Sequence, residues 1–361
     1  MRALVFDAPS HVVWKDLPAP EPMEPYGAVL QPLLVSPCSS DAHTVYGGSV
    51  PKQENHVLGH ECVARVVSVA SGVRDFLPGE VVAVPAITPD WRALAIQEGN
   101  DRHAEDHFSG HRLGRTRPGV FAERFAVPDA DTTLAHIPEG VSEEQALMAV
   151  DVMTTGFTGA EYANIKTGDT VCVMGIGPVG LMAIAAAVHL GAARVIAVGS
   201  RPVCVRLASR YGATDIVNYR ACDVVRKVLE LTDGIGPDSV ILAGGGDEVF
   251  QQAVEMVRYG IGTISNVNYY GGDGALEFPK FAGGRGMAGK TIHTELARGG
   301  RARIERMLRM IACGRVDPGP LVTHRFSGME MIGPALALMR DKPADLVKAA
   351  VVMNPKTGIA R

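Results

Sequence analysis

The fold of this chain is decided by the stretch Val171-Cys172-Val173-Met174-Gly175-Ile176-Gly177-Pro178-Val179-Gly180-Leu181-Met182-Ala183. An apolar run typical of a buried strand leads into a G-x-G-x-x-G loop, and a helix-like apolar run follows it. The glycines permit a tight turn and the close approach of a pyrophosphate, whose charge would lie at the free N–H groups of the helix N-terminus. The loop Gly175, Ile176, Gly177, Pro178, Val179 and Gly180 therefore predicts a dinucleotide site.

The end of the next strand indicates which dinucleotide is bound. A site for NAD would place Asp or Glu there, where a carboxylate accepts hydrogen bonds from the adenosine ribose. Here the strand Arg194–Val198 ends in Gly199-Ser200-Arg201. Because no carboxylate repels a 2′-phosphate, and a hydroxyl and a guanidinium can receive it, we predict NADP(H) rather than NAD(H).

Strand and helix patterns alternate from about residue 155 to residue 296. Helix-like segments such as Asp223–Leu231 and Glu248–Arg258 separate the apolar runs. This alternation predicts an α/β fold, with a doubly wound parallel sheet covered on both faces. The six predicted strands are Val171–Gly175, Arg194–Gly199, Asp215–Asn218, Ser239–Ala243, Gly262–Val267 and Thr291–Leu296.

The composition is that of a globular enzyme-sized chain. Its 361 residues suggest about two domains, and a net charge of −4 argues against a nucleic-acid-binding surface. No apolar run is long enough to span a bilayer, and the N-terminus is strand-like rather than a signal peptide. The six cysteines form no paired framework, which fits a reducing cytoplasm.

The chain before residue 150 consists of short β-like runs broken by Pro and Gly, such as Ala28–Val35 and Ala64–Val69. The polar segment Thr88–Gly119 predicts a lobe or long loop. Ser142-Glu143-Glu144-Gln145 has the spacing of a capping box and should begin a helix that continues to Met153. We expect a first domain at residues 1–154, a Rossmann domain at 155–296, and a return to the first domain at 297–361.

Three residues before the Rossmann unit offer metal ligands. Cys38 lies in a turn, His60 stands beside Glu61, and Asp151 interrupts an otherwise apolar helix. Sulfur, nitrogen and oxygen donors suit tetrahedral zinc with one position open for substrate. From the residues alone, the cysteine could equally be a buried small hydrophobe, the histidine a structural residue, and the aspartate a cap or half of an ion pair.

Specific motifs then connect the chain to a known family. It resembles the zinc-dependent medium-chain alcohol dehydrogenases, and more closely their tetrameric NADP-dependent secondary-alcohol (isopropanol) branch, from Met1 to about Met353. The motifs are Ser36-Pro37-Cys38, Leu58-Gly59-His60-Glu61, Thr88-Pro89-Asp90-Trp91-Arg92, Met153-Thr154-Thr155-Gly156-Phe157, the glycine loop, Val198-Gly199-Ser200-Arg201-Pro202 and Leu338-Met339-Arg340-Asp341-Lys342-Pro343.

The resemblance implies a GroES-like β-rich catalytic domain with an inserted Rossmann domain. It implies one catalytic zinc held by Cys38, His60 and Asp151, with Glu61 as an occasional fourth ligand, and a proton relay through Ser40 and His43. It further implies a substrate pocket and a set of cofactor contacts. The pocket would be lined by Ser40, Ala86, His111 and Leu296, and the cofactor contacts beyond the glycine loop would be Gly199, Ser200, Arg201, Tyr219, Val267, Asn268, Tyr269 and Lys342. Tyr219 could instead be a packing residue at a strand end, and Lys342 a solvated surface lysine.

The sequence also departs from its relatives. No cysteine lies between Cys62 and Cys172, so a four-thiolate structural zinc is excluded. His103, His107 and His111 follow an i, i+4, i+8 spacing, but a solvated polar lobe is the better interpretation. At His111 the relatives carry a tryptophan that walls the pocket. The imidazole should make the pocket larger and wetter, and we expect it to accept ketones bulkier or more polar than acetone.

Three functions remain in view. The leading one is reversible oxidation of a secondary alcohol to a ketone, or reduction of a ketone or aldehyde, by a cytoplasmic homotetramer that binds neither nucleic acid nor membrane. The second is a polyol or sugar dehydrogenase of the same superfamily, which usually prefers NAD. The third is a non-catalytic NADPH-binding protein or a zinc-free quinone reductase relative, which would lack the Cys, His and Asp donors.

Overall fold

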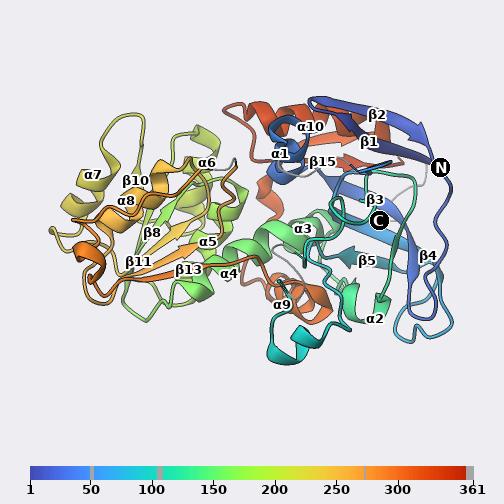
Figure 1. Cartoon of the computed structure of the whole chain (residues 1–361), viewed down its shortest axis with the longest axis horizontal. Helices are drawn as coiled ribbons and strands as arrows, with labels where there is room; N and C mark the ends of the chain where they lie inside the picture. The colour runs from blue at the N-terminus through green and yellow to red at the C-terminus, as the bar shows by residue number, and fades with distance from the viewer. Residues whose placement is uncertain (49–52, 104–108, 272–273, 355–361) are drawn as a thin grey trace. The chain divides into compact units, whose positions relative to one another are not determined.

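The chain folds into two compact units in the computed structural model, which describes residues 1–48, 53–103, 109–271 and 274–354 (Figure 1). Unit 1 contains Met1–Thr154 and the chain from Arg298 onward, and unit 2 contains Thr155–Ala297. Unit 2 is therefore an insertion in the sequence of unit 1.

A six-stranded sheet forms the centre of unit 2. Its order is β10-β9-β8-β11-β12-β13, and every pair of neighbours is parallel. The order reverses between β8 and β11, and ligands bind at the carboxyl ends of the strands beside such a reversal. The strands are β8 (Thr170–Met174), β9 (Arg194–Val198), β10 (Asp215–Val217), β11 (Ser239–Leu242), β12 (Thr263–Asn266) and β13 (Thr291–Thr294).

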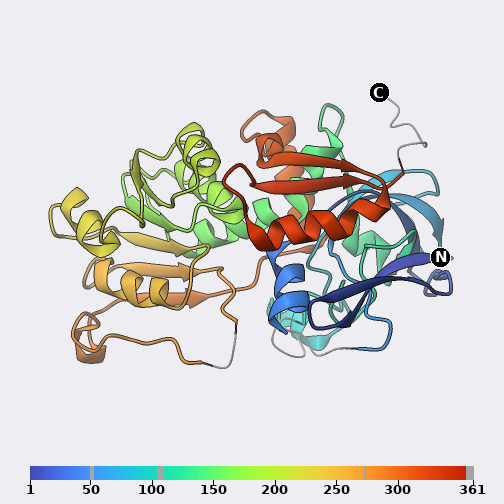
Figure 2. The same cartoon turned by 90° about the horizontal axis from the view of Figure 1, so that it is seen from above.

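Helices cover both faces of this sheet (Figure 2). The helices α5 and α6 pack together, as do α7 and α8, so each pair forms one layer. Buried strand residues such as Cys172, Ile196 and Val240 pack against Val228 and Val254 from the helices. The helices of this unit are α4 (Thr154–Tyr162, its first residue still in unit 1), α5 (Pro178–His189), α6 (Pro202–Arg210), α7 (Val224–Leu231) and α8 (Glu248–Met256).

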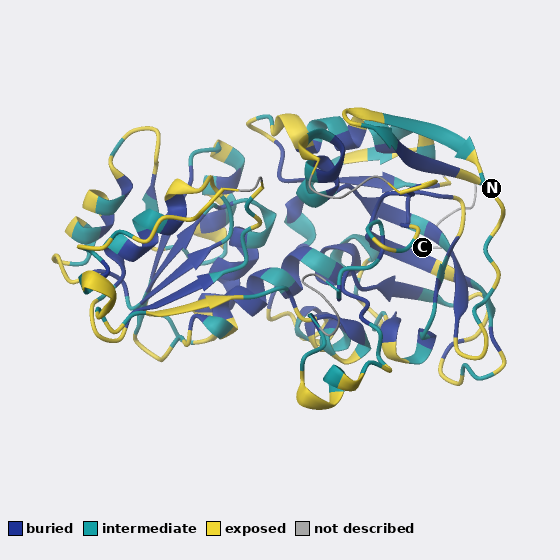
Figure 3. Cartoon of the chain, in the orientation of Figure 1, coloured by how far each residue is buried: buried dark blue, intermediate teal, exposed yellow. Residues whose placement is uncertain are grey.

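The outermost strand β13 differs from the expectation of a fully covered sheet. All four of its residues are exposed (Figure 3). Within the described chain it pairs on one side only, with β12. The difference goes with the edge position of β13, because an edge strand has a neighbouring strand on one side only.

Unit 1 is built on a seven-stranded, mostly antiparallel sheet. Its order is β14-β15-β3-β4-β5-β7, and β6 also pairs with β3. Apolar side chains such as Leu30, Leu58 and Phe121 form its core. The strands, with the separate hairpin β1–β2, are β1 (Arg2–Ala8), β2 (His11–Asp16), β3 (Ala28–Ser36), β4 (Glu61–Val69), β5 (Val81–Val84), β6 (Phe125–Val127), β7 (Ala135–His136), β14 (Val322–Ser327) and β15 (Lys348–Val352).

The helices of unit 1 pack against different strands of this sheet: α10 against β15, α3 against β3 and β4, and α9 against β7. In the predicted lobe, the described residues contain one short 3₁₀ turn, η1 (Leu94–Glu98). No helix in the described part of the chain is long and apolar enough to cross a membrane. The helices of this unit are α1 (Ser39–Gly47), α2 (Ala130–Thr133), α3 (Glu143–Met148), α9 (Gly300–Ala312) and α10 (Ile332–Asp341), with 3₁₀ turns η4 (Gly319–Leu321) and η5 (Met329–Met331).

The helix predicted after Ser142 begins as an α-helix, as expected, and then becomes a π-helix. Ser142 and Gln145 form the predicted capping box, with Gln145 N donating to Ser142 Oγ at 3.2 Å and Ser142 N donating to Gln145 Oε1 at 3.0 Å. After α3, however, the chain forms a π-helix, η2 (Ala149–Met153), rather than continuing as α-helix. A π-turn holds one residue more than an α-turn and is frequent at functional sites.

Candidate metal centre and cofactor site

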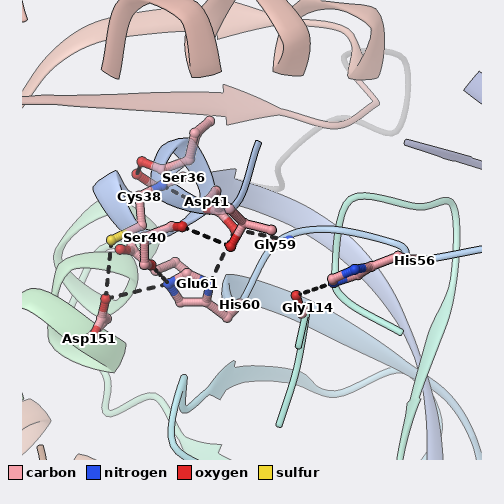
Figure 4. A network of polar contacts seen from close by, with 12 residues as sticks. Ser36, Cys38, Ser40, Asp41, His56, Gly59, His60, Glu61, Gly114 and Asp151 are labelled. Atoms are coloured by element: carbon pink, nitrogen blue, oxygen red, sulfur yellow. Dashed lines mark hydrogen bonds and ion pairs between the residues drawn. The ribbon is translucent and has the colours of Figure 1, made fainter. Parts of the chain in front are cut away.

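Four possible metal ligands meet in unit 1 (Figure 4). Cys38 is the N-cap of α1, His60 and Glu61 stand at the start of β4, and Asp151 lies in the π-helix. One ligand atom from each lies within 4.8 Å of the others. Segments more than 100 residues apart in the sequence therefore converge on one point.

The cluster fits zinc. Asp151 Oδ2 is 3.7 Å from both Cys38 Sγ and His60 Nε2. Zinc–ligand bonds of about 2.0–2.3 Å give tetrahedral edges of roughly 3.3–3.8 Å. Glu61 Oε2 is buried without a hydrogen-bond partner among the described residues, which leaves it available as a further ligand. The separations and the S, N and O donors are those of a catalytic zinc site.

Asp41 orients His60, and the sequence analysis missed it. Its Oδ1 lies 3.4 Å from His60 Nδ1 and accepts a hydrogen bond from Gly59 N at 3.2 Å, and its Oδ2 accepts from Cys38 N at 2.8 Å. Both side chains are 3% exposed. A carboxylate on the far nitrogen sets the tautomer and direction of a ligating histidine. The signal was the capping spacing Cys38-x-x-Asp41, which places a carboxylate behind the cysteine turn.

Lys348 is the second residue that the sequence analysis missed. Its Nζ donates to Glu61 Oε1 at 2.6 Å and to Pro37 O at 3.0 Å, and both side chains of the pair are almost fully buried. A lysine in the apolar strand Lys348–Val352 was the available signal, because such a charge is rarely buried without a partner. Burial opposes its charge, but Glu61 and then Cys38 raise the pKa of Lys348 above its ordinary value.

The charges of the metal-free cluster favour loss of the proton from Cys38 and Asp151 and retention of a second proton on His60. Burial would raise the pKa of Cys38, but Lys348 and His60 lower it. Burial would also raise the pKa of Asp151, and its contacts with His60 lower it instead. Burial would lower the pKa of His60, but Asp41 and Asp151 raise it well above its ordinary value. The imidazole therefore holds a proton that a metal ion must displace.

The predicted relay residues lie on α1 beside this cluster. Ser40 Oγ is 3.2 Å from His60 Nε2. His43 follows one turn later and is half-buried. Burial, and then the charge of Lys342, lower the pKa of His43.

The predicted pocket residues are placed as follows. The ring of His111 stands edge-on to that of His60, with centroids 4.6 Å apart and an interplanar angle of 77°. Burial, and then His60, lower the pKa of His111 to about 3, so the ring is neutral. Ala86 is buried in unit 1, and Leu296 is half-buried in unit 2. Of the other lobe histidines, His103 is not in a helix and His107 lies outside the described residues.

The glycine loop in unit 2 has the backbone that its motif requires. Gly175 has φ +86°, and a Cβ there would lie 2.6 Å from the backbone of Gly244. A Cβ on Gly180 would lie 1.9 Å from the carbonyl oxygen of Gly175. Pro178 occupies the first turn of α5, so the loop ends at a helix N-terminus. Helix N-terminal N–H groups attract phosphate.

The residues predicted around the 2′-phosphate adjoin this loop. A guanidinium nitrogen of Arg201 lies 3.8 Å from where a Cβ on Gly177 would stand, and Gly199 packs against Ile176 so closely that no side chain fits. The Ser200 hydroxyl, and then Arg220, lower the pKa of Tyr219. Ser200, Arg201 and Tyr219 are thus brought together.

Arg220 joins the group of Ser200, Arg201 and Tyr219, and it was not predicted from the sequence. It lies over the Tyr219 ring, 5.8 Å from the centroid. Its position next to Tyr219 in the sequence was the available signal.

The other predicted cofactor residues are divided between the units. Val267, Asn268 and Tyr269 follow β12 at the carboxyl edge of the sheet, and Asn268 Nδ2 donates to Gly245 O at 3.2 Å. Lys342 belongs to unit 1, where it ends α10 in the left-handed conformation with φ +48°.

The parallel α/β unit, the β-rich unit and the S, N and O donors together indicate a class of zinc-dependent dehydrogenase. Comparison with known proteins identifies the family. The model "Alcohol dehydrogenase GroES-like domain" matches residues 25–139, and "Zinc-binding dehydrogenase" matches residues 178–312. The chain belongs to the zinc-type alcohol dehydrogenase family, which confirms the resemblance found in its motifs.

Individual relatives within this family include NADP-dependent isopropanol dehydrogenases. The NADP-dependent isopropanol dehydrogenase of Thermoanaerobacter brockii is 50% identical over 94% of this chain and 95% of its own length. That of Clostridium beijerinckii is 51% identical over 91% of this chain and 93% of its own. The solved alcohol dehydrogenase TADH from Thermus sp. ATN1 matches with a TM-score of 0.87 and 31% identity, covering 98% of this chain and 100% of its own.

Proposed function

We propose that this chain is an NADP(H)-dependent zinc alcohol dehydrogenase that interconverts secondary alcohols and ketones, and also reduces aldehydes. The observation that carries the proposal is the convergence of Cys38, His60, Glu61 and Asp151 on one point. The NADP-dependent isopropanol dehydrogenases at 50% and 51% identity support the same activity.

In this proposal Cys38, His60 and Asp151 hold one catalytic zinc, with Glu61 as an occasional fourth ligand. When bound, zinc supplies a Lewis acid for the substrate oxygen, and the nicotinamide supplies or accepts the hydride. Asp41 keeps His60 directed at the cluster. Ser40 exchanges the proton of the substrate oxygen, because a hydroxyl both donates and accepts, and His43 passes it on.

The cofactor is assigned to unit 2. The pyrophosphate lies against the glycine loop, and Ser200, Arg201 and Tyr219 hold the 2′-phosphate and adenine. Residues 1–154 and 297–361 form the catalytic domain in this proposal, and residues 155–296 form the NADP domain. Further cofactor contacts come from Gly199, Val267, Asn268, Tyr269 and Lys342, and the substrate is lined by Ser40, Ala86, His111 and Leu296.

Metal analysis and a comparison of the two nicotinamide cofactors test the proposal. We expect about one zinc per chain and reduction of 2-butanone with NADPH but little with NADH. Arg201→Asp should weaken NADPH binding far more than NADH binding, because it puts a carboxylate where the 2′-phosphate lies. Equal loss for both cofactors contradicts the assignment of Arg201. Faster turnover of polyols with NADH favours a sugar dehydrogenase, and absence of zinc favours a non-catalytic relative.

The exposed edge of unit 2 supports a homo-oligomer, which we propose is a homotetramer in the cytoplasm. Among the described residues, the strand β13 pairs on one side only. Large apolar side chains nearby in the sequence are exposed, Phe281 by 86% and Met287 by 85%. Exposed edges and apolar patches mark association surfaces. Light scattering should give four chains per particle, and Phe281→Asp should reduce that number. A monomer in the unmodified protein overturns the assignment.

A further inference from the structure

The proposed zinc ligand Asp151 lies in a π-turn that is fixed by backbone hydrogen bonds at both ends. Val150 O accepts a hydrogen bond from Ala86 N at 3.2 Å, so strand β5 continues into a contact with the π-helix. At the other end, Thr154 N donates to Asp151 O itself. Val150 and Val152 are buried on either side of Asp151. The direction of the carboxylate therefore depends on where Thr154 stands.

Thr154 is fixed in turn by its side chain. It is fully buried, and its hydroxyl donates to Arg298 O at 2.8 Å and accepts from Arg303 Nε at 2.9 Å. A second guanidinium nitrogen of Arg303 donates to Thr154 O at 3.3 Å. Arg303 thus holds both the side chain and the carbonyl of Thr154.

The helix that carries Arg303 is itself docked on the segment that holds the π-helix. Gly300 N donates to Ile87 O at 3.2 Å, one residue beyond Ala86. A Cβ on Gly299 would lie 2.2 Å from the same oxygen, so the backbone approach is as close as glycine allows. Ile304 and Leu308 are buried and anchor α9 in the core. The π-helix and Arg303 consequently share one rigid support.

We propose that Thr154 and Arg303 are positioning residues that hold Asp151 in the geometry required for zinc. In this proposal they act through the backbone of the π-helix rather than as zinc ligands. Loss of either support lets the π-turn relax toward an ordinary α-turn, which rotates Asp151 away from Cys38 and His60. This inference rests on the proposed zinc function.

Thr154→Val and Thr154→Ser form the decisive pair. Valine keeps the shape and removes the hydroxyl, and serine keeps the hydroxyl. Zinc affinity, measured by competition with a chromophoric chelator, should fall about 10- to 100-fold in Thr154→Val and stay near that of the unmodified protein in Thr154→Ser. The absorption bands of the cobalt(II)-substituted protein should change in the same order, because they report ligand geometry.

Arg303→Met and Arg301→Met separate positioning from stability. Arg301 lies on the same helix and contacts Asp75 and Glu305 instead. Arg303→Met should weaken zinc binding and alter the cobalt bands, and Arg301→Met should lower thermal stability without either effect. Arg303→Lys keeps a hydrogen-bond donor and should recover part of the zinc affinity. If Thr154→Val does not fold, the comparison of Arg303→Lys with Arg303→Met tests the positioning role instead.

Unchanged zinc affinity and cobalt bands in Thr154→Val and Arg303→Met overturn the inference. Equal losses in Arg301→Met and Arg303→Met also overturn it, because they indicate a general effect of stability. An unmodified protein that binds no zinc removes the proposed function itself, which is a different result from normal zinc binding in every variant.

Discussion

Replacing Lys348 with Met tests whether a buried cation keeps Glu61 ionised beside the metal cluster. The change removes the contact to Glu61 Oε1 at 2.6 Å and the hydrogen bond to Pro37 O at 3.0 Å, and methionine fills most of the same volume. Glu61 is 0% exposed and would be left as an uncompensated buried charge. Breaking such a pair from one side costs about 3–5 kcal/mol.

Protonation of Glu61 limits this cost and makes it depend on pH. An ordinary glutamate titrates at 4.5, and each pH unit above that value is worth about 1.4 kcal/mol. Protonating Glu61 at pH 7 therefore costs about 3.4 kcal/mol. Burial already raises the pKa of Glu61 in the unmodified protein, and Lys348 is the group that lowers it most. In the variant the folded state therefore keeps the proton to a still higher pH, and the loss of stability grows as the pH rises above the pKa that Glu61 has beside Lys348. We expect a deficit of at most about 3 kcal/mol at pH 7 and a smaller one, at most about 1.4 kcal/mol, at pH 5.5.

Tryptophan fluorescence in denaturant measures this deficit in the right part of the molecule. The chain has two tryptophans, Trp14 and Trp91, and both belong to unit 1. The zinc-free protein is used, so that metal binding does not add to stability. Lys15→Met is the matched control, since Lys15 pairs with Asp7 at 3.0 Å on the surface and should contribute less than 1 kcal/mol.

Two outcomes would refute the reasoning on Lys348. One is a deficit no larger than that of Lys15→Met, and the other is a deficit that does not grow between pH 5.5 and pH 7. Adding Glu61→Gln to Lys348→Met should remove the pH dependence and recover much of the stability, because no charge is then buried.

Three further predictions concern zinc, the cofactor loop and the pocket. Asp41→Asn should weaken zinc binding about 10- to 100-fold. It should also lower the raised pKa of His60. Zinc affinity rises with pH, by up to about tenfold per unit, as long as zinc must displace that proton, so this rise should move to lower pH in the variant. An unchanged pH profile of zinc affinity in chelator competition contradicts this prediction. Gly175→Ala should impair NADPH binding by fluorescence titration while zinc content stays normal, because its Cβ would meet Gly244 at a positive φ; normal NADPH affinity rules this out. Steady-state rates on a ketone size series should fall little beyond acetone because His111 leaves room, and a sharp preference for the smallest ketone refutes that expectation.

The sequence predicted the unit 2 fold and the position of the glycine loop well, because their signals are local. A strand, a glycine loop and a helix are adjacent in the chain. Gly175 is required by its positive φ, and Gly180 by its contact with Gly175 in the same loop. The six strands were predicted with ends within about two residues of those observed. The exposure of β13 was not predicted, since the periodicity of a strand does not say whether it lies at an edge.

The metal cluster could not be predicted from local sequence patterns alone. The sequence indicated Cys38, His60 and Asp151 as candidate ligands. Because these residues are far apart in the chain, their types alone did not exclude structural roles, and only the family resemblance favoured a zinc site. Asp41 and Lys348 were missed because one looks like a helix cap and the other like a strand lysine. Only the placement of β15 and β4 on either side of β3 gives Lys348 a buried partner, and only the folding of α1 against the start of β4 brings Asp41 behind His60.

By itself the sequence determined that a dinucleotide loop without a strand-end carboxylate lies in an inserted parallel α/β unit, and that sulfur, nitrogen and oxygen donors are present in the other part of the chain. The tertiary structure decided that four donors converge within 4.8 Å, that one of them lies in a π-turn, and that a buried lysine and an aspartate contact two of them. The physical reason is that loop conformation depends on neighbours in sequence, but ligand geometry and burial depend on contacts between segments that the sequence does not order in space.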